Sequence, residues 1–306
     1  MSSAFFTTSD GDIVLRASSP PDSEHDFRVH KFILSLASSV FKDMFAIPQP
    51  PDQTLDEHFQ LPVVDVPEPP EVLDLILRLI YPGVEPPAIT KPSTLSAALF
   101  AADKYDISSI YPTFRESLKM ILSGDCNTLW AYIMACRFRF PEVAKQAAKA
   151  MNTWALSNLR NCQDIQHVSS TDLYRLVQFV LKRERNGLLL IRGIFDPLSL
   201  EDSADCSHDG EDTQGYYFRL QKAVEEVFLE NPCVEADRLS RVLDMVPDPP
   251  RGCKPHEKPA DWYLNCDDDD YIFNCPLRPM TIRKTLREVA CDLDRINAET
   301  LNEFFG

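Results

Sequence analysis

The sequence predicts an α+β fold in its first part, followed by an all-helical region. Two observations lead to this prediction. Strand-like segments occur only in the first quarter of the 306-residue chain, and amphipathic helical segments then continue to its end. Pairs of prolines lie between many of these segments. Because proline ends or prevents regular structure, these pairs mark the boundaries of the predicted elements. A chain of this length holds about two domains. With 44% hydrophobic residues, it can build a core without disulfides.

The N-terminal elements are predicted to be a hairpin, a helix pair and a third strand. Residues 12–17 and 26–30 have the composition of two hairpin strands joined by a polar turn. An apolar face with three- and four-residue spacing then predicts two short helices that break near Ser38. Segment 61–66 predicts a short strand, and Pro62 limits that strand to an edge or an end of the sheet.

Helical periodicity completes the first domain. It predicts three further helices, at residues 69–81, 93–106 and 108–123. Pro70 suits the first turn of the first helix, and Glu71 is favourable at its positive N-terminal end. Ser93 is a candidate cap for the second helix. We therefore predict one α+β unit over residues 8–123, with the hairpin beside these helices.

From residue 127 onward the strand signals end. The sequence predicts a helical extension over 127–195, an exposed acidic linker over 196–215, and a mostly helical C-terminal region over 216–306. The run from Ser169 to Asp172 predicts a capping box at a helix start. The C-terminal apolar stripes are too regular for a disordered tail, so we expect these helices to pack on the extension without a metal.

The charge of the chain limits its partners. It has 31 basic and 47 acidic residues, a formal net charge of −16. Nucleic-acid binding depends on neutralising phosphates, so we expect neither direct nucleic-acid binding nor attachment to an anionic membrane surface. The sequence shows no apolar run long enough for a membrane span and no signal peptide. We therefore expect a cytoplasmic or nuclear protein whose nine cysteines are mostly free thiols.

Three stretches of the first 123 residues resemble a known family, the BTB (POZ) domains. They are Gly11 to Leu15 with Phe27 to Phe45, then Phe59 to Tyr81, then Ala98 to Leu122. The first is similar to the family's opening strand and its histidine-lysine pair, here His30 and Lys31. The second is similar to the short strand and a helix that ends in tyrosine, and the third to the paired helices. Proline-rich insertions suggest a divergent, fungal type of BTB protein.

The resemblance implies a short β-sheet flanked by helices and a homodimer formed through the first helices. We expect the dimer face to contain Phe32, Leu36, Val40, Phe41 and Met44. Short helices with apolar residues on more than one side cannot hide all of them in a small core, and exposed apolar patches usually bind a partner.

Two polar residues of the same region are predicted to be structural. We expect His30 to satisfy a backbone group at the entry to a buried helix. Asp12 is expected to anchor the helix N-termini near it. Neither is expected to carry out chemistry.

The resemblance also implies an adaptor function. Residues 127–190 are weakly similar to the helical (BACK-like) extension that follows BTB domains in many adaptors, whose partner is often the cullin scaffold of a ubiquitin ligase. Such domains usually have a hydrophobic-x-glutamate element after the second helix. No glutamate follows Met44-Phe45, although Leu55-Asp56-Glu57 has the pattern. The alternative is a transcriptional or chromatin co-regulator, which here has no zinc-finger spacing or basic helix of its own.

The sequence contains no motif that indicates catalysis. It lacks a glycine-rich phosphate loop, a G-x-S-x-G elbow, an H-E-x-x-H pair and a dinucleotide-binding fingerprint, so we expect neither an enzyme nor a cofactor. Four residues form two candidate zinc-binding pairs, Cys206 with His208 and Cys253 with His256. Their spacings are loose and the pairs lie far apart, so we favour free thiols over a zinc site.

Overall fold

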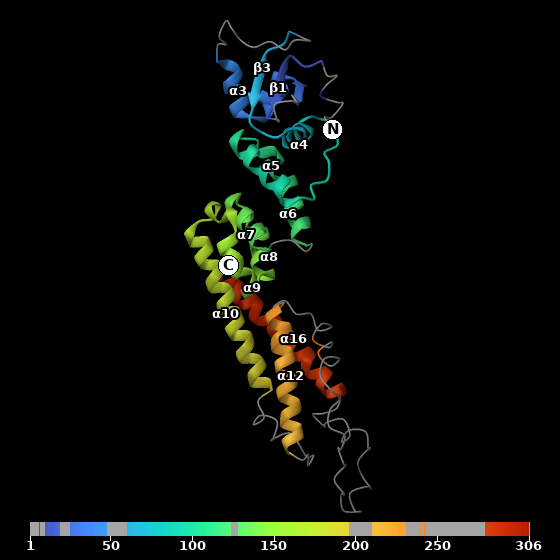
Figure 1. Cartoon of the computed structure of the whole chain (residues 1–306), viewed down its shortest axis with the longest axis vertical. Coiled ribbons are helices and arrows are strands. Elements are labelled where there is room, and N and C mark those ends of the chain that lie inside the picture. Colours follow the sequence, from blue (N-terminus) through green and yellow to red (C-terminus); the bar gives the residue numbers. More distant parts are fainter. Residues whose placement is uncertain are drawn as a thin grey trace, which may run out of the picture. The chain divides into compact units, whose positions relative to one another are not determined.

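The computed structural model describes most of the chain as two compact units. It describes residues 6, 10–18, 25–47, 60–123, 128–195, 210–230, 239, 242 and 279–305. The first unit contains Met1–Cys126 with Phe138–Val143, and the second contains Asn127–Arg137 with Ala144–Gly306. The helical extension and the C-terminal helices thus belong to the same unit. Figure 1 shows the helices and strands of both units.

The first unit contains a three-stranded sheet in the order β2-β1-β3. Its strands are β1 (Ile13–Ala17), β2 (His25–Val29) and β3 (Val63–Val66). β1 pairs antiparallel with β2, as the predicted hairpin requires, and parallel with β3. β3 is an edge strand that begins just after Pro62, which agrees with the predicted limit, because proline has no backbone N–H to donate to a neighbouring strand.

Helices pack beside this sheet and form the rest of the first unit. They are α2 (Lys31–Ala37), α3 (Ser39–Ala46), α4 (Pro70–Ile80), α5 (Pro92–Lys104) and α6 (Tyr111–Leu122), with the 3-10 helix η1 (Ser108–Ile110) before α6. The predicted break is at Ser38, whose side chain accepts a hydrogen bond from the Phe41 N–H at the start of α3. α4 begins at Pro70 with Glu71 in its first turn, as predicted.

The predicted cap of α5 is wrong. This helix begins at Pro92, so Ser93 lies inside the first turn, and the N-cap Lys91 makes no side-chain capping bond. Proline fits that first turn because its missing N–H is one that the helix would leave unpaired in any case.

The remaining helices follow residue 127. They are α7 (Thr128–Arg137), α8 (Pro141–Ala150), α9 (Thr153–Ser157), η2 (Asn158–Asn161), η3 (Gln163–His167), α10 (Ser170–Ile194), α12 (Gly210–Glu230) and α16 (Pro279–Phe305). The predicted capping contact is present at α10: the Ser169 hydroxyl accepts from the Asp172 N–H at 3.0 Å and donates to the Asp172 carboxylate at 2.6 Å.

The start of α12 corrects the predicted linker. The helix begins at Gly210, inside the segment 196–215 that the sequence predicts as a linker. The sequence from position 210 is Gly-Glu-Asp, and acidic residues are as common at a helix start as in a linker.

Three long helices build the core of the second unit. α12 and α16 both pack on α10 (Figure 1). The buried apolar cluster of this core contains Ile191, Phe195, Tyr216, Tyr217, Leu220, Val224, Phe228, Leu286, Val289, Ala290 and Leu293, together with Leu239 and Val242 from outside the three helices. The expected packing of the C-terminal region on the extension is therefore present. Among the helices that the structure describes, none has an apolar stretch long enough to cross a bilayer.

Gly187 lets α10 and α12 approach closely. A Cβ atom at this position would lie 2.2 Å from Cζ of Phe228, and that ring is buried. We expect Gly187→Ala to lower the free energy of unfolding of the second unit by about 1–3 kcal/mol, because the buried ring must shift within a packed core to admit the methyl group. Urea unfolding measures this loss.

Gly193 provides the matched control on the same helix. A Cβ there would meet no atom within 4 Å. We expect Gly193→Ala to raise stability by about 0.5–1 kcal/mol, because alanine favours the helical backbone. An equal effect of the two substitutions would contradict the steric explanation.

Candidate protein-interaction surface

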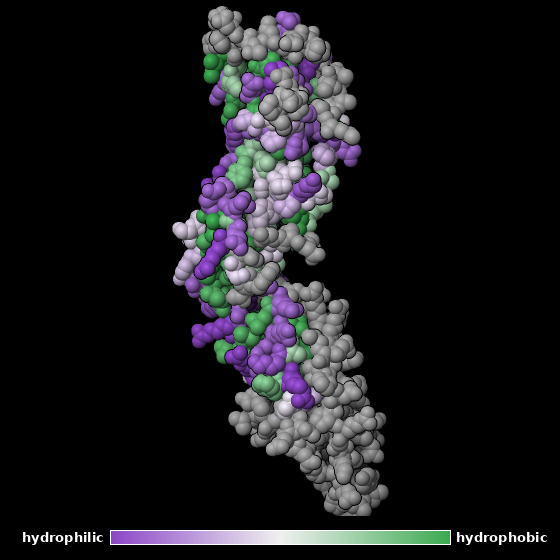
Figure 2. All heavy atoms as spheres, in the orientation of Figure 1, coloured by the Kyte–Doolittle hydropathy of each residue, from purple (hydrophilic) through white to green (hydrophobic). Residues whose placement is uncertain are grey.

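Three apolar side chains on α2 and α3 are exposed to solvent. Phe32 is 77% exposed, Leu36 79% and Val40 38%, and we refer to these three residues as the α2–α3 surface. Figure 2 shows hydrophobic side chains reaching the surface over α3. Met44 is half-buried at the margin of this surface. Such a patch removes apolar area from water only when a partner covers it.

Phe41 does not belong to the surface, and its predicted placement there is wrong. It is only 2% exposed. Its ring stacks on Tyr105 with 4.6 Å between ring centroids and 12° between ring planes, and it also stacks on Phe45 at 5.9 Å. Val40 and Phe41 are adjacent in a helix, so their side chains point about 100° apart. When Val40 faces solvent, Phe41 turns toward the core.

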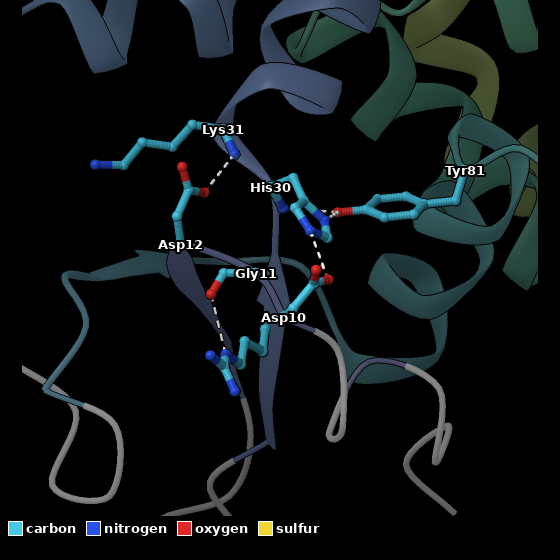
Figure 3. Close-up of polar contacts among 7 residues, drawn as sticks. Asp10, Gly11, Asp12, His30, Lys31 and Tyr81 are labelled. Atoms are coloured by element: carbon cyan, nitrogen blue, oxygen red, sulfur yellow. Dashed lines mark hydrogen bonds and ion pairs between the residues drawn. The ribbon is translucent and has the colours of Figure 1, made fainter.

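Asp12 holds the start of α2. Its carboxylate accepts a hydrogen bond from the backbone N–H of Lys31, the first residue of that helix, at 2.8 Å (Figure 3). The first N–H groups of a helix have no partner within it, and a negative charge is favourable there. This contact is the one expected of a structural residue, and it positions the helix that carries Phe32 and Leu36.

His30 connects three segments of the first unit. Its backbone N–H donates to the Tyr81 hydroxyl at 2.7 Å, ring Nδ1 lies 3.1 Å from the same hydroxyl, and Nε2 lies 2.9 Å from Oδ1 of Asp10 (Figure 3). The sequence predicted that the ring would satisfy a backbone group, and this is wrong. The ring partners are side chains, one of them the residue that follows α4.

The Tyr81 hydroxyl can both accept and donate a hydrogen bond in this cluster. Burial raises the pKa of Tyr81 to about 12, so the hydroxyl keeps its proton at neutral pH. It can then accept from the His30 N–H and donate to Nδ1, which leaves Nε2–H to donate to Asp10. A hydrogen bond of Asp10 with its own backbone and the contact with His30 lower the pKa of the Asp10 carboxyl. The histidine therefore acts as a connector between the sheet, α2 and α4.

A buried polar cluster supports the other side of the helix pair. The Tyr105 hydroxyl donates to Glu68 at 2.5 Å, the Lys104 ammonium donates to the same carboxylate at 2.8 Å, and the Ser38 hydroxyl donates to the Tyr105 carbonyl at 2.5 Å. Burial, and then the contact with Glu68, raise the pKa of Tyr105. Ser38 lies between α2 and α3, so this cluster fixes the angle at which the two helices meet.

Sequence reasoning missed this cluster. Glu68 follows β3 and has the sequence appearance of a solvated loop residue, yet it is buried. Glutamate is almost never buried unless it is paired, and its partners Lys104 and Tyr105 are more than 30 residues away. A single polar residue carries no local signal of such a distant pair.

The other candidate residues fall outside this surface. Cys206, His208, Cys253 and His256, the zinc candidates, lie outside the described residues, as does the segment Leu55-Asp56-Glu57. Within the part of the chain that the structure describes, no group of three or more His, Cys, Asp or Glu side chains is arranged to hold a metal ion. The zinc question therefore remains a prediction from the sequence.

The described cysteines are free thiols. They are Cys136, Cys162 and Cys291. Burial raises the pKa of the Cys136 thiol to about 11, which keeps it protonated at neutral pH. Because the thiolate is the reactive form, Cys136 is a poor nucleophile.

Comparison with known proteins identifies the first unit. Residues 5–122 match the family model of the BTB/POZ domain. No curated protein matches the chain. The match covers the sheet, the α2–α3 surface and the polar contacts that support it. BTB/POZ domains are protein–protein interaction modules and are not typically catalytic, which gives this chain an adaptor role in general terms. Residues 5–122 are therefore a BTB/POZ domain.

Proposed function

We propose that the chain is an interaction adaptor that self-associates through the α2–α3 surface. The observation that carries this proposal is the exposure of Phe32, Leu36 and Val40 on two helices whose ends are held by hydrogen bonds to other segments of the domain. Asp12 fixes the start of α2, and Ser38 joins the helix pair to Tyr105. A surface held in this way needs little ordering when it binds, which favours association.

The charges around the surface favour a second copy as its occupant. The chain as a whole carries −16, which would repel another copy. Helices α2 and α3, however, carry Lys31 and Lys42 against Asp43, and Asp106 is hydrogen-bonded to Ser39, so the charge of this region is close to neutral. Two identical surfaces can therefore approach without strong repulsion, and a two-fold arrangement lets each exposed residue contribute twice.

Leu36→Asp tests self-association. Placing a charge on this exposed side chain should leave the fold intact but weaken the dimer by more than about tenfold, because burying an unpaired carboxylate is costly. Sedimentation velocity of the full chain at micromolar concentration measures the shift from dimer to monomer. We expect Phe32→Asp to act in the same direction.

Met120→Asp is the matched control. Met120 is 69% exposed and lies on α6, outside the α2–α3 surface. This variant should keep the wild-type sedimentation behaviour. A strictly monomeric wild-type chain, or a dimer that Leu36→Asp leaves unchanged, would remove the basis for the proposal.

For the second partner we propose a cullin-type ubiquitin-ligase scaffold, with the adaptor acting in the cytoplasm or nucleus. Two observations support it: helices follow the BTB/POZ domain directly, and Ile47 just beyond α3 is 62% exposed. The alternative is a transcriptional co-regulator.

Affinity purification of the full chain with mass spectrometry distinguishes the cullin adaptor from the co-regulator. Recovery of a cullin that is lost in Ile47→Asp supports the scaffold, whereas recovery of a co-repressor, or of neither class, contradicts it.

A further inference from the structure

One side of α10 carries apolar residues in alternation with polar ones, of which Arg185 is charged. Tyr174, Gln178, Leu181, Arg185 and Leu189 recur at three- and four-residue spacing, so they share one face of the helix. We refer to these five residues as the α10 stripe. Tyr174 is 67% exposed, Leu181 47% and Leu189 59%. Figure 2 shows hydrophobic and hydrophilic residues side by side along α10.

The stripe is not explained by the core of the second unit. α10 already buries a different face, which includes Leu176, Phe179, Arg183, Gly187 and Ile191. An amphipathic helix normally has charged or polar residues opposite its buried face. Here large apolar side chains recur along about four turns of the outward face. Scattered exposed apolar residues are ordinary, but a regular row of them is typical of a helix-binding surface.

The charge of α10 indicates the chemistry of the partner. The helix contains five basic residues and two acidic ones, a balance of +3 in a chain that carries −16. Most of these cations already have partners: Arg175 pairs with Asp172, Lys182 with Glu303 and Arg192 with Glu225. Arg185 is exposed in the middle of the stripe, and it forms no ion pair with any of the residues that the structure describes.

We propose that the α10 stripe docks an acidic amphipathic helix of a partner protein. Apolar residues at three- and four-residue spacing on that helix would cover Tyr174, Leu181 and Leu189, and a carboxylate would pair with Arg185. A second copy of this chain is disfavoured, because a two-fold pairing of the stripe would bring its own Arg185 close to the first. The α2–α3 surface lies in the other unit, so this proposal stands independently of self-association.

A pair of designed peptides tests the proposal. The probe is a labelled helical peptide as long as α10, with leucines at three- and four-residue spacing and glutamates beside them. Its control has lysine at each glutamate position. Fluorescence anisotropy with the full chain should show saturable binding of the acidic peptide and little binding of the basic one.

Substitutions in the stripe locate the binding. Leu181→Ser and Leu189→Ser should each weaken binding of the acidic peptide by about tenfold, the effect of losing one buried leucine. Arg185→Glu should weaken the acidic peptide and increase binding of the basic one, a charge exchange that general misfolding cannot produce. Met120→Ser, which changes an exposed apolar residue on α6, should leave both affinities unchanged.

Several results would overturn the proposal. These are the absence of saturable binding of the acidic peptide, equal binding of both peptides, and binding that Leu189→Ser leaves unaffected. Sedimentation velocity in which Leu181→Ser abolishes self-association would assign the stripe to a second copy. Co-flotation with vesicles of phosphatidylserine and phosphatidylcholine that depends on Leu189 would assign it to a membrane. Either assignment excludes the docked helix.

Discussion

Phe41→Ala is expected to destabilise the BTB/POZ domain by about 3–5 kcal/mol, the usual range when a buried phenylalanine is truncated in a packed core. The ring is almost fully buried and stacks between Phe45 and Tyr105. Its loss leaves a cavity next to the buried cluster of Glu68 and Tyr105. Because that cluster holds Ser38, we expect the helix pair to loosen together with the core.

Hydrogen exchange measured by mass spectrometry on the full chain tests this expectation. Peptides from β1, β2 and α3 should lose protection, while peptides from α10 should keep it, because these elements belong to different units. The control is Val40→Ala, the exposed neighbour, which should cost less than about 1 kcal/mol. Equal losses for the two substitutions would contradict the assignment of Phe41 to the core and Val40 to the surface.

Arg183→Met is expected to cost the second unit about 3 kcal/mol, because it leaves several backbone carbonyls without a donor. Arg183 is fully buried in α10. Its guanidinium donates to the carbonyls of Lys149, at 2.7 Å, and of Ala148 and Met151, at the C-terminal end of α8. It also lies over the Phe179 ring, 5.0 Å from the centroid. A buried cation is favourable at this negative end of a helix.

Tryptophan fluorescence during urea unfolding measures this loss, since Trp130 is buried in the second unit and all three tryptophans of the chain follow residue 127 in the sequence. Arg183→Lys should give an intermediate loss, because lysine keeps the charge but lacks the planar fork that reaches several carbonyls at once. Arg185→Met, two residues along the same helix and exposed, should leave the unfolding midpoint unchanged. A similar midpoint for Arg183→Met and Arg185→Met would contradict the proposed role of the buried guanidinium.

The order of the elements could be predicted from the sequence because their signals are local. A short apolar run defines β1, alternation defines β2, and three- and four-residue spacing defines α2 to α6. Proline marked the start of α4 correctly, because its effect acts on its own turn. Local reasoning failed where two explanations fit the same residues: acidic residues before Tyr216 suit both a linker and a helix start, and the structure has the helix.

The interaction surface could be predicted only in part. Periodicity placed Phe32, Leu36 and Val40 near one another, but it could not decide which of the adjacent residues Val40 and Phe41 faces the core. That choice depends on Tyr105, which lies far along the chain. The partners of His30 were missed for the same reason, since Tyr81 is 51 residues away. Pairwise contacts over such distances leave no pattern in a single sequence.

The parallel pairing of β1 with β3 has a consequence for how the domain folds. Val14 pairs with Val63, so this pairing closes a loop of about 50 residues, whereas the β1–β2 hairpin closes one of about 10. The longer closure costs about 1–2 kcal/mol more in chain entropy. α2 and α3 lie within that long loop, and folding them shortens the free chain that must be closed. Attachment of the edge strand is thus thermodynamically coupled to the formation of the same two helices that present the exposed apolar surface.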